Sequence, residues 1–123
     1  MYAGLFAPDG KFLQRGGVVH TGRESLASLG YRTARGPQSV FHYVMSHAIE
    51  PTPDGNARGK EELVQFTIGD NGQPSTVFGG GHYDDIYERT ADGWRFKQRQ
   101  FIPSQSGYEL TIPTTDVPEQ RRI

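Results

Sequence analysis

The stretch that decides the fold is GGGHYDDIYERTADGWRFKQRQF, residues 79–101. Two runs rich in aromatic residues flank an Ala-Asp-Gly turn, a pattern typical of a β-hairpin. Because side chains alternate across a strand, Tyr83, Asp85 and Tyr87 share one face. A plain core strand would carry Val or Ile at these positions. Either the tyrosines are ordinary sheet aromatics, or this face forms a polar site with aromatic walls.

Three more strand candidates accompany this hairpin. The four predicted strands cover residues 40–50, 56–68, 75–90 and 94–102. Short links that contain Asp-Gly or Asn-Gly favour an antiparallel meander. The three glycines at 79–81 interrupt the third strand, and they predict a bend or bulge because glycine in a strand interior is otherwise unfavourable.

The N-terminal third adds one helix to this sheet. We expect an apolar stub at 1–6, a turn at 7–10, short strands at 11–14 and 18–20, and a helix at 21–32 with a capping-box pattern. The fold class is therefore α+β, with the helix covering one face of a curved sheet and a ligand pocket in its mouth. We expect one domain over residues 1–104. The tail at 105–123 holds a short strand candidate, YELTI, and then a frayed end.

Composition excludes several classes of protein. The chain has 123 residues and a net charge of −1, and its 13 basic residues are spread among 14 acids, so no basic field predicts nucleic-acid binding. The absence of cysteine excludes disulfides, thiol catalysis and thiolate metal sites. No signal peptide and no apolar run near the ~20 residues of a membrane span are visible, so we expect a cytoplasmic protein.

Strand alternation selects the candidate site residues. In the first long strand, His42, Val44 and Ser46 share a small, mostly apolar face that suits a cavity wall, whereas His47 falls on the opposite face, so we expect no shared metal. An inward Asp85 needs a partner, and burial would raise its pKa. Simpler interpretations stand beside these: a half-exposed His42, a solvated Glu61-Glu62 pair, and Trp94 as core. In the fourth strand, alternation separates Phe96 from Arg99 and Phe101.

Three segments together resemble a known family. LFAPDGKF (5–12), FHYVMSHAIE (41–50) and the hairpin, which follows a G-x-Y-x-D-x-Y-x-R-x-x-x-G-W pattern from Gly81 to Trp94, resemble the SnoaL-like branch of the nuclear transport factor 2-like (NTF2-like) superfamily. The resemblance covers about residues 2–104, and the hairpin is its most specific part. It implies a cone-shaped NTF2-like or cystatin-like roll, in which a strongly curved, antiparallel-rich sheet wraps around helices and leaves an apolar pocket.

The resemblance also implies a chemistry. Family members include polyketide cyclases, scytalone-type dehydratases, steroid isomerases and bile-acid dehydratases, which move protons next to a carbonyl without a metal. We therefore expect a cofactor-free dehydratase or isomerase for a small hydrophobic carbonyl compound that is polyketide- or steroid-like. His42, Asp85 and Tyr83 match the catalytic positions, and Ser46 replaces the family's asparagine. The expected substrate-binding residues are Tyr43, Val44, Ser46, Phe66, Tyr87, Trp94 and Phe101.

Two alternatives to this function stay open. One is a non-catalytic module for small-molecule binding or dimerisation. The other is epoxide hydrolysis, which needs an Asp-Arg-Asp set; Asp85 and Arg99 supply two members, and no third is identified. The family's leading helix is not matched either. We expect either an open cone, whose exposed apolar surface favours a homodimer, or a truncated form of a longer gene product.

Overall fold

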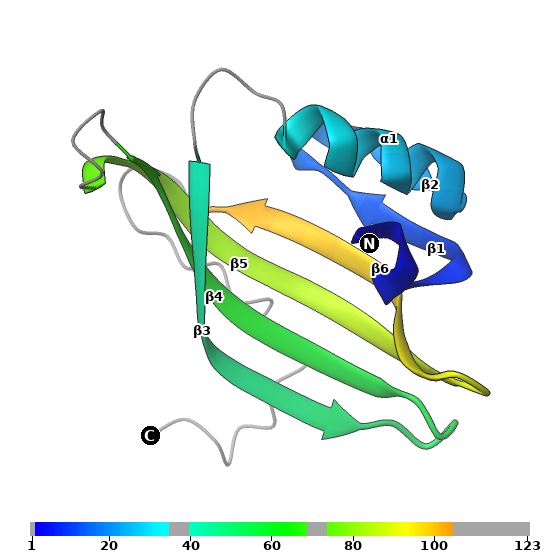
Figure 1. The fold of residues 1–123 in the computed structure, drawn as a ribbon. Coiled ribbons are helices and arrows are strands. Elements are labelled where there is room, and N and C mark those ends of the chain that lie inside the picture. Colours follow the sequence, from blue (N-terminus) through cyan, green and yellow to red (C-terminus); the bar gives the residue numbers. More distant parts are fainter. Residues whose placement is uncertain (1, 35–39, 69–73, 105–123) are drawn as a thin grey trace, which may run out of the picture.

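The protein folds into one mixed sheet with a helix over part of its concave face (Figure 1). A computed structural model describes residues 2–34, 40–68 and 74–104. The six strands lie in the order β2-β1-β6-β5-β4-β3. In chain order the elements are η1 (Tyr2–Leu5), β1 (Phe6–Leu13), η2 (Arg15–Gly17), β2 (Val19–Thr21), α1 (Gly22–Ala34), β3 (Val40–Pro51), β4 (Ala57–Ile68), β5 (Pro74–Thr90) and β6 (Gly93–Pro103).

The predicted antiparallel meander is confirmed. Strands β3, β4, β5 and β6 pair consecutively and antiparallel, and their bounds agree with the predicted ranges to about one residue. The sheet becomes mixed because β1 pairs parallel to β6. The turn predicted at 7–10 is instead a bulge inside β1, where the pairing jumps from Phe6 opposite Phe96 to Lys11 opposite Gln98. The predicted strand at 108–112 lies outside the described residues.

The glycine stretch of β5 lies where the strands come close together. A Cβ atom on Gly80 would lie 2.7 Å from the carbonyl oxygen of Leu63, and one on Gly81 would overlap the backbone of Ile102. The pairing register between β4 and β5 shifts next to these glycines, between Gln65 and Phe66 of β4. The predicted irregularity is therefore present, and it accompanies the curvature of the sheet in Figure 1.

The core forms where α1 meets the sheet. Phe6 and Leu26 are fully buried, and the other members of the apolar cluster around them are Ala3, Phe12, Leu63 and Tyr83. Helix α1 packs against η1, β1 and β2, so it covers one end of the sheet (Figure 1). The predicted α+β class with a curved, cone-like sheet is confirmed.

The opposite edge of the sheet keeps large apolar side chains at the surface. Strand β3 forms this edge, and five of its residues are between 37% and 60% exposed: Phe41, Tyr43, Val44, Met45 and Ile49. Among the described residues, no helix is long and apolar enough to cross a membrane.

Candidate active site

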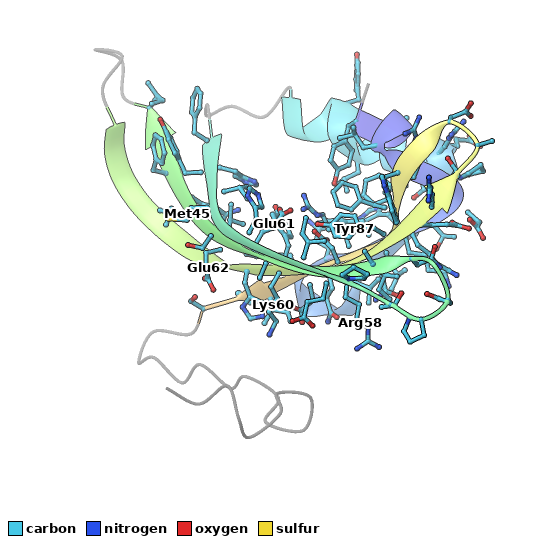
Figure 2. The ribbon with its side chains drawn as sticks, turned by 90° about the horizontal axis from the view of Figure 1, so that it is seen from below. Met45, Arg58, Lys60, Glu61, Glu62 and Tyr87 are labelled. Atoms are coloured by element: carbon cyan, nitrogen blue, oxygen red, sulfur yellow. The ribbon has the colours of Figure 1, made fainter. Side chains whose placement is uncertain are left out.

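The concave face of the sheet carries a group of polar side chains from four strands. We call this group the concave cluster, and it consists of His42 and His47 from β3, Glu61 and Gln65 from β4, Tyr83, Asp85 and Tyr87 from β5, and Arg99 from β6. The strand register aligns its centre, because Tyr83 lies opposite Glu61 and Asp85 lies opposite Arg99. Figure 2 shows Glu61 and Tyr87 on the concave side and Arg58, Lys60 and Glu62 on the convex side.

Arg99 is the centre of the concave cluster. Its Nε lies 2.9 Å from Asp85 Oδ1, and its Nη2 lies 2.7 Å from Asp85 Oδ2 and 2.6 Å from Glu61 Oε2. The guanidinium carbon also lies 4.0 Å from the ring centre of Tyr83 and 4.2 Å from that of Phe96. A planar guanidinium is suited to this position, because it donates to two carboxylates in its plane and stacks on rings above and below.

Tyr87 links the two acids. Its hydroxyl donates to Asp85 Oδ2 at 3.0 Å and to Glu61 Oε1 at 3.1 Å. Burial, reinforced by both carboxylates, raises the pKa of Tyr87, so the phenol stays protonated and remains a donor. Two carboxylates thus share one guanidinium and one hydroxyl within an almost dry cluster, where Asp85 is 2% exposed and Glu61 is 8% exposed.

Burial and pairing act in opposite directions on the ion pair. Burial raises the pKa of Asp85 and outweighs the lowering by Arg99. Burial lowers the pKa of Arg99, but its bonds and charges with Asp85 and Glu61 outweigh this and raise it. Arg99 is therefore the permanent charge of the site. We regard Asp85 as ionised at neutral pH, because both of its oxygens accept from N–H or O–H donors.

His42 and Tyr83 form a second pair on the same face. Tyr83 Oη lies 3.4 Å from His42 Nδ1, and Gln65 Nε2 lies 2.9 Å from His42 Nε2. Partial burial lowers the pKa of His42 from its ordinary 6.5, and burial raises the pKa of Tyr83. At neutral pH the site therefore holds an uncharged imidazole beside a protonated phenol.

A β-bulge brings His47 onto the concave face. The pairing of β3 with β4 shifts between Met45 and Ala48, and Ser46 adopts a positive φ of 55°. As a result His47 Nε2 lies 3.6 Å from Glu61 Oε1. The prediction that His42 and His47 lie on opposite faces is wrong, because the extra residue in the bulge reverses the alternation.

A second bulge, in β6, changes which of its side chains share the concave face, so the faces predicted for this strand are wrong. The register passes from Ile86 opposite Gln98 to Tyr87 opposite Phe96, which leaves Lys97 without a partner on β5. Phe96 and Arg99 therefore share the concave face, whereas simple alternation separates them. Without this bulge, the ring of Phe96 would not lie against the Arg99 guanidinium.

Several predicted residues lie together on this face. His42, Tyr83, Asp85 and Tyr87 belong to the concave cluster, and the Phe101 ring packs 5.7 Å from that of Tyr83. Val44 lies opposite Leu63 beside them, and Ser46 is in the bulge.

Three predicted residues lie elsewhere. Tyr43 packs against Phe66 with ring centres 5.2 Å apart and the rings tilted. Both residues alternate to the convex face because they neighbour His42 and Gln65. Trp94 is 50% exposed at the end of the β5–β6 hairpin, so its assignment to the core is wrong.

Besides His47 and Gln65, two further contributors to the site were not predicted. Glu61, predicted as solvated surface, is buried against Arg99; the available signal was that strand alternation points one acid of the Glu61-Glu62 pair inward. Tyr2 of η1 is the other. Its ring lies 5.4 Å from Phe6, and burial, with a contribution from Tyr83, raises its pKa to about 12. Nothing in the N-terminal sequence pairs Tyr2 with the hairpin.

A hollow of about 420 Å³ lies at the ends of β1 and β6, and Phe101 is the one predicted site residue in its wall. Its lining is Leu13, Gln14, Gly16, Gly17, Val19, Gln100, Phe101, Ile102 and Pro103. No group of three metal-ligand side chains occurs in residues 2–34, 40–68 and 74–104.

Replacement of Asp85 tests the central ion pair. We expect Asp85→Asn to lower the free energy of unfolding, measured by urea denaturation, by about 3 kcal/mol, because Arg99 loses a bidentate partner in a buried site. The control Asp84→Asn removes the neighbouring, part-exposed acid of the convex face and should change stability by less than about 1 kcal/mol. If both variants lost the same free energy of unfolding, the cost of burying the Asp85 carboxylate would cancel the gain from its pairing with Arg99.

Gly59 tests the position of Tyr87. A Cβ atom at residue 59 would lie 2.6 Å from Tyr87 Cε2, so the ring rests directly on the β4 backbone. We expect Gly59→Ala to displace the ring, break its two hydrogen bonds and lower the free energy of unfolding by about 1–3 kcal/mol. The control Gly4→Ala meets no atom within 4 Å and should be close to neutral. An unchanged urea midpoint for Gly59→Ala would contradict the role given to this contact.

Comparison with known proteins places this fold in a family. None of the curated proteins matches significantly. A structure of Rv3472 from Mycobacterium tuberculosis, a protein of unknown function, matches with a TM-score of 0.74 at 26% identity; the match covers 85% of this chain, which spans 59% of that one. ActVI-ORFA from Streptomyces coelicolor matches with a TM-score of 0.73 at 19% identity, covering 83% and 79% of the two chains.

A third similar structure names the fold itself. It is an NTF2-like protein with a cystatin-like fold from Novosphingobium aromaticivorans, with a TM-score of 0.65 at 22% identity and coverage of 80% and 64%. The sequence of residues 1–100 matches the SnoaL-like domain family. The curved sheet, the hairpin and this match lead to one conclusion: the chain belongs to the SnoaL-like domain family within the NTF2-like fold.

Proposed function

We propose that this protein is a cofactor-free enzyme of the dehydratase or isomerase type, which moves a proton next to the carbonyl group of a small hydrophobic, polyketide- or steroid-like compound. The observation that carries the proposal is the pair of His42 and Tyr83, a neutral imidazole 3.4 Å from a protonated phenol on the concave face. An imidazole that is neutral near pH 7 can accept a proton, and a phenol can donate to an oxygen that gains charge.

The proposed step uses both groups at once. The substrate oxygen accepts the Tyr83 hydroxyl and replaces the long contact to His42. Nδ1 of His42 then removes the proton from the α-carbon, while the electron pair moves onto the oxygen as an enolate. Gln65 acts as a positioning residue. Its amide nitrogen lies 2.9 Å from Nε2 of His42 and donates to it in the free protein, and a half-turn of the amide presents its oxygen to Nε2–H, which holds the tautomer that leaves Nδ1 free.

Asp85 contributes through Arg99 rather than through His42. Both carboxylate oxygens of Asp85 accept hydrogen bonds from Arg99 or Tyr87, so Asp85 does not orient the imidazole of His42. The role we propose is to hold the guanidinium over the Tyr83 ring, where a fixed positive charge favours the negative charge that develops at the phenol and the enolate.

Epoxide hydrolysis is a second candidate, and one specific observation favours it. Glu61 supplies the third member of an acid-guanidinium-acid set, with Arg99 between Glu61 and Asp85. One carboxylate would take a proton from the attacking water, and the other, which must first bind a proton, would pass that proton to the epoxide oxygen. Diol formation from a neutral apolar epoxide, lost in Glu61→Gln, would support this reaction over proton transfer at a ketone.

Proton exchange at the α-carbon tests the first candidate. A thermal-shift screen of neutral ketones selects ligands, and ¹H NMR in D₂O follows the α-hydrogens of each one. We expect the protein to accelerate exchange, and His42→Asn to reduce that acceleration by about 100-fold or more. The control His82→Asn changes a histidine of the convex face and should leave the rate intact. A ligand that raises the melting temperature without any exchange would favour the non-catalytic binding module.

The pH dependence of that exchange follows from His42. Only the neutral imidazole accepts a proton, so the rate should fall as the pH drops through the pKa of His42. Because partial burial lowers this pKa, the midpoint of the fall should lie below 6.5. The exchange rate between pH 4.5 and 8 measures it. A rate that increases toward acid pH would contradict the role of His42 as the base.

The homodimer stays a proposal. Its support is the exposed apolar side chains of β3 at the sheet edge, among them Phe41, Tyr43 and Ile49. A monomer in light scattering at micromolar concentration would contradict it.

A further inference from the structure

We propose that His47, oriented by Glu61, is a second acid–base group of this site and protonates a leaving hydroxyl while His42 removes the α-proton. The inference rests on the proposed function, and it assigns chemistry to a side chain that strand alternation alone places on the wrong face. It separates elimination of water, which needs both histidines, from simple proton exchange, which needs only His42.

The backbone at Ser46 is the first support. A positive φ of 55° at a serine is uncommon for a residue with a side chain, and here it forms the bulge that turns His47 toward β4. Bulges of this kind frequently re-aim one side chain near an active site. Without the bulge, the imidazole of His47 would lie with Tyr43 on the convex face.

The anchoring of Glu61 is the second support. Its Oε2 lies 2.6 Å from Arg99 Nη2, and its Oε1 accepts from the Tyr87 hydroxyl at 3.1 Å. The same Oε1 lies 3.6 Å from Nε2 of His47, whose side chain is 54% exposed. A carboxylate held on two sides can orient the ring, while the exposed edge of the ring stays accessible to a ligand and to solvent.

The different surroundings of the two imidazoles suggest different roles. Among the described residues, the hydrogen-bond partners of His42 are uncharged, Tyr83 and Gln65, whereas His47 lies 3.6 Å from the carboxylate of Glu61. Titratable groups in contrasting environments are the usual basis of a division into acid and base. Tyr83 spans the distance between them, because it lies opposite Glu61 in the register and yet its hydroxyl reaches His42. The proposed elimination therefore places the two adjacent carbons of a β-hydroxy ketone between the two imidazoles, with its carbonyl oxygen at the Tyr83 hydroxyl.

The step balances without any further reactant. Nδ1 of His42 takes the α-proton, the C–H electron pair becomes the new C=C bond, and the C–O bond at the β-carbon breaks. The leaving oxygen takes a proton from His47 and departs as water. Solvent then returns the proton from His42 to His47, which its exposed side chain allows. The substrate should be neutral, because within the concave cluster the one guanidinium is already occupied by two carboxylates.

Two probe compounds separate the two roles. One is 4-phenylbutan-2-one, which can only exchange its α-hydrogens. The other is 4-hydroxy-4-phenylbutan-2-one, which can also lose water to give a conjugated enone with a strong ultraviolet absorbance. We expect His47→Asn to keep exchange of the first compound within about threefold of wild type, while enone formation from the second falls by about 100-fold or more. His42→Asn should lose both reactions, and the control His82→Asn should keep both.

The outcomes distinguish this inference from the function on which it rests. Retained exchange shows that His47→Asn is folded, and added imidazole should restore enone formation in His47→Gly. Equal loss of both reactions in His47→Asn, or unchanged enone formation, would overturn the role of His47 and leave the proposed function standing. A wild-type protein that exchanges neither compound would overturn the proposed function, and this inference with it.

Discussion

The bridging position of Arg99 is the constraint on which the site depends. Its guanidinium joins Asp85 on β5 to Glu61 on β4, so one side chain ties three neighbouring strands together on their concave face. Two carboxylates could not remain ionised side by side in so dry a place without it. The same group lies over the rings of Tyr83 and Phe96, and it therefore orients the phenol that we propose as the donor to substrate.

Irregularities of the backbone, rather than the regular strands, select the side chains that meet. The bulge at Ser46 turns His47 inward, and the bulge at Lys97 places Phe96 and Arg99 on one face. The small residues of β4 and β5 add room, since Gly59 admits the Tyr87 ring. A curved sheet with bulges can thus gather long polar side chains from four strands into one cluster, which a flat sheet would hold apart.

Membership in a fold family does not by itself choose the chemistry. In this chain the choice rests on two pairs: His42 with Tyr83, and His47 with Glu61. Both pairs lie on the concave face. Burial keeps the Tyr83 phenol protonated beside His42, and Glu61 is held in place beside His47. The neutral donors of this site, and a guanidinium already occupied by two carboxylates, are the reason why we propose a neutral carbonyl compound as the substrate.

The sequence by itself determined the strand order of the meander, the helix and the shared face of Tyr83, Asp85 and Tyr87, because turn residues and period-two alternation are local properties. It also supported the family resemblance that the match to residues 1–100 confirms. Only the tertiary structure decided that Glu61 is buried, that His47 faces inward, and that Tyr43 and Trp94 lie outside the cluster. The physical reason is that one inserted residue reverses every following side chain, and that an acid is buried only when a distant arginine, here 38 residues away, meets it in space.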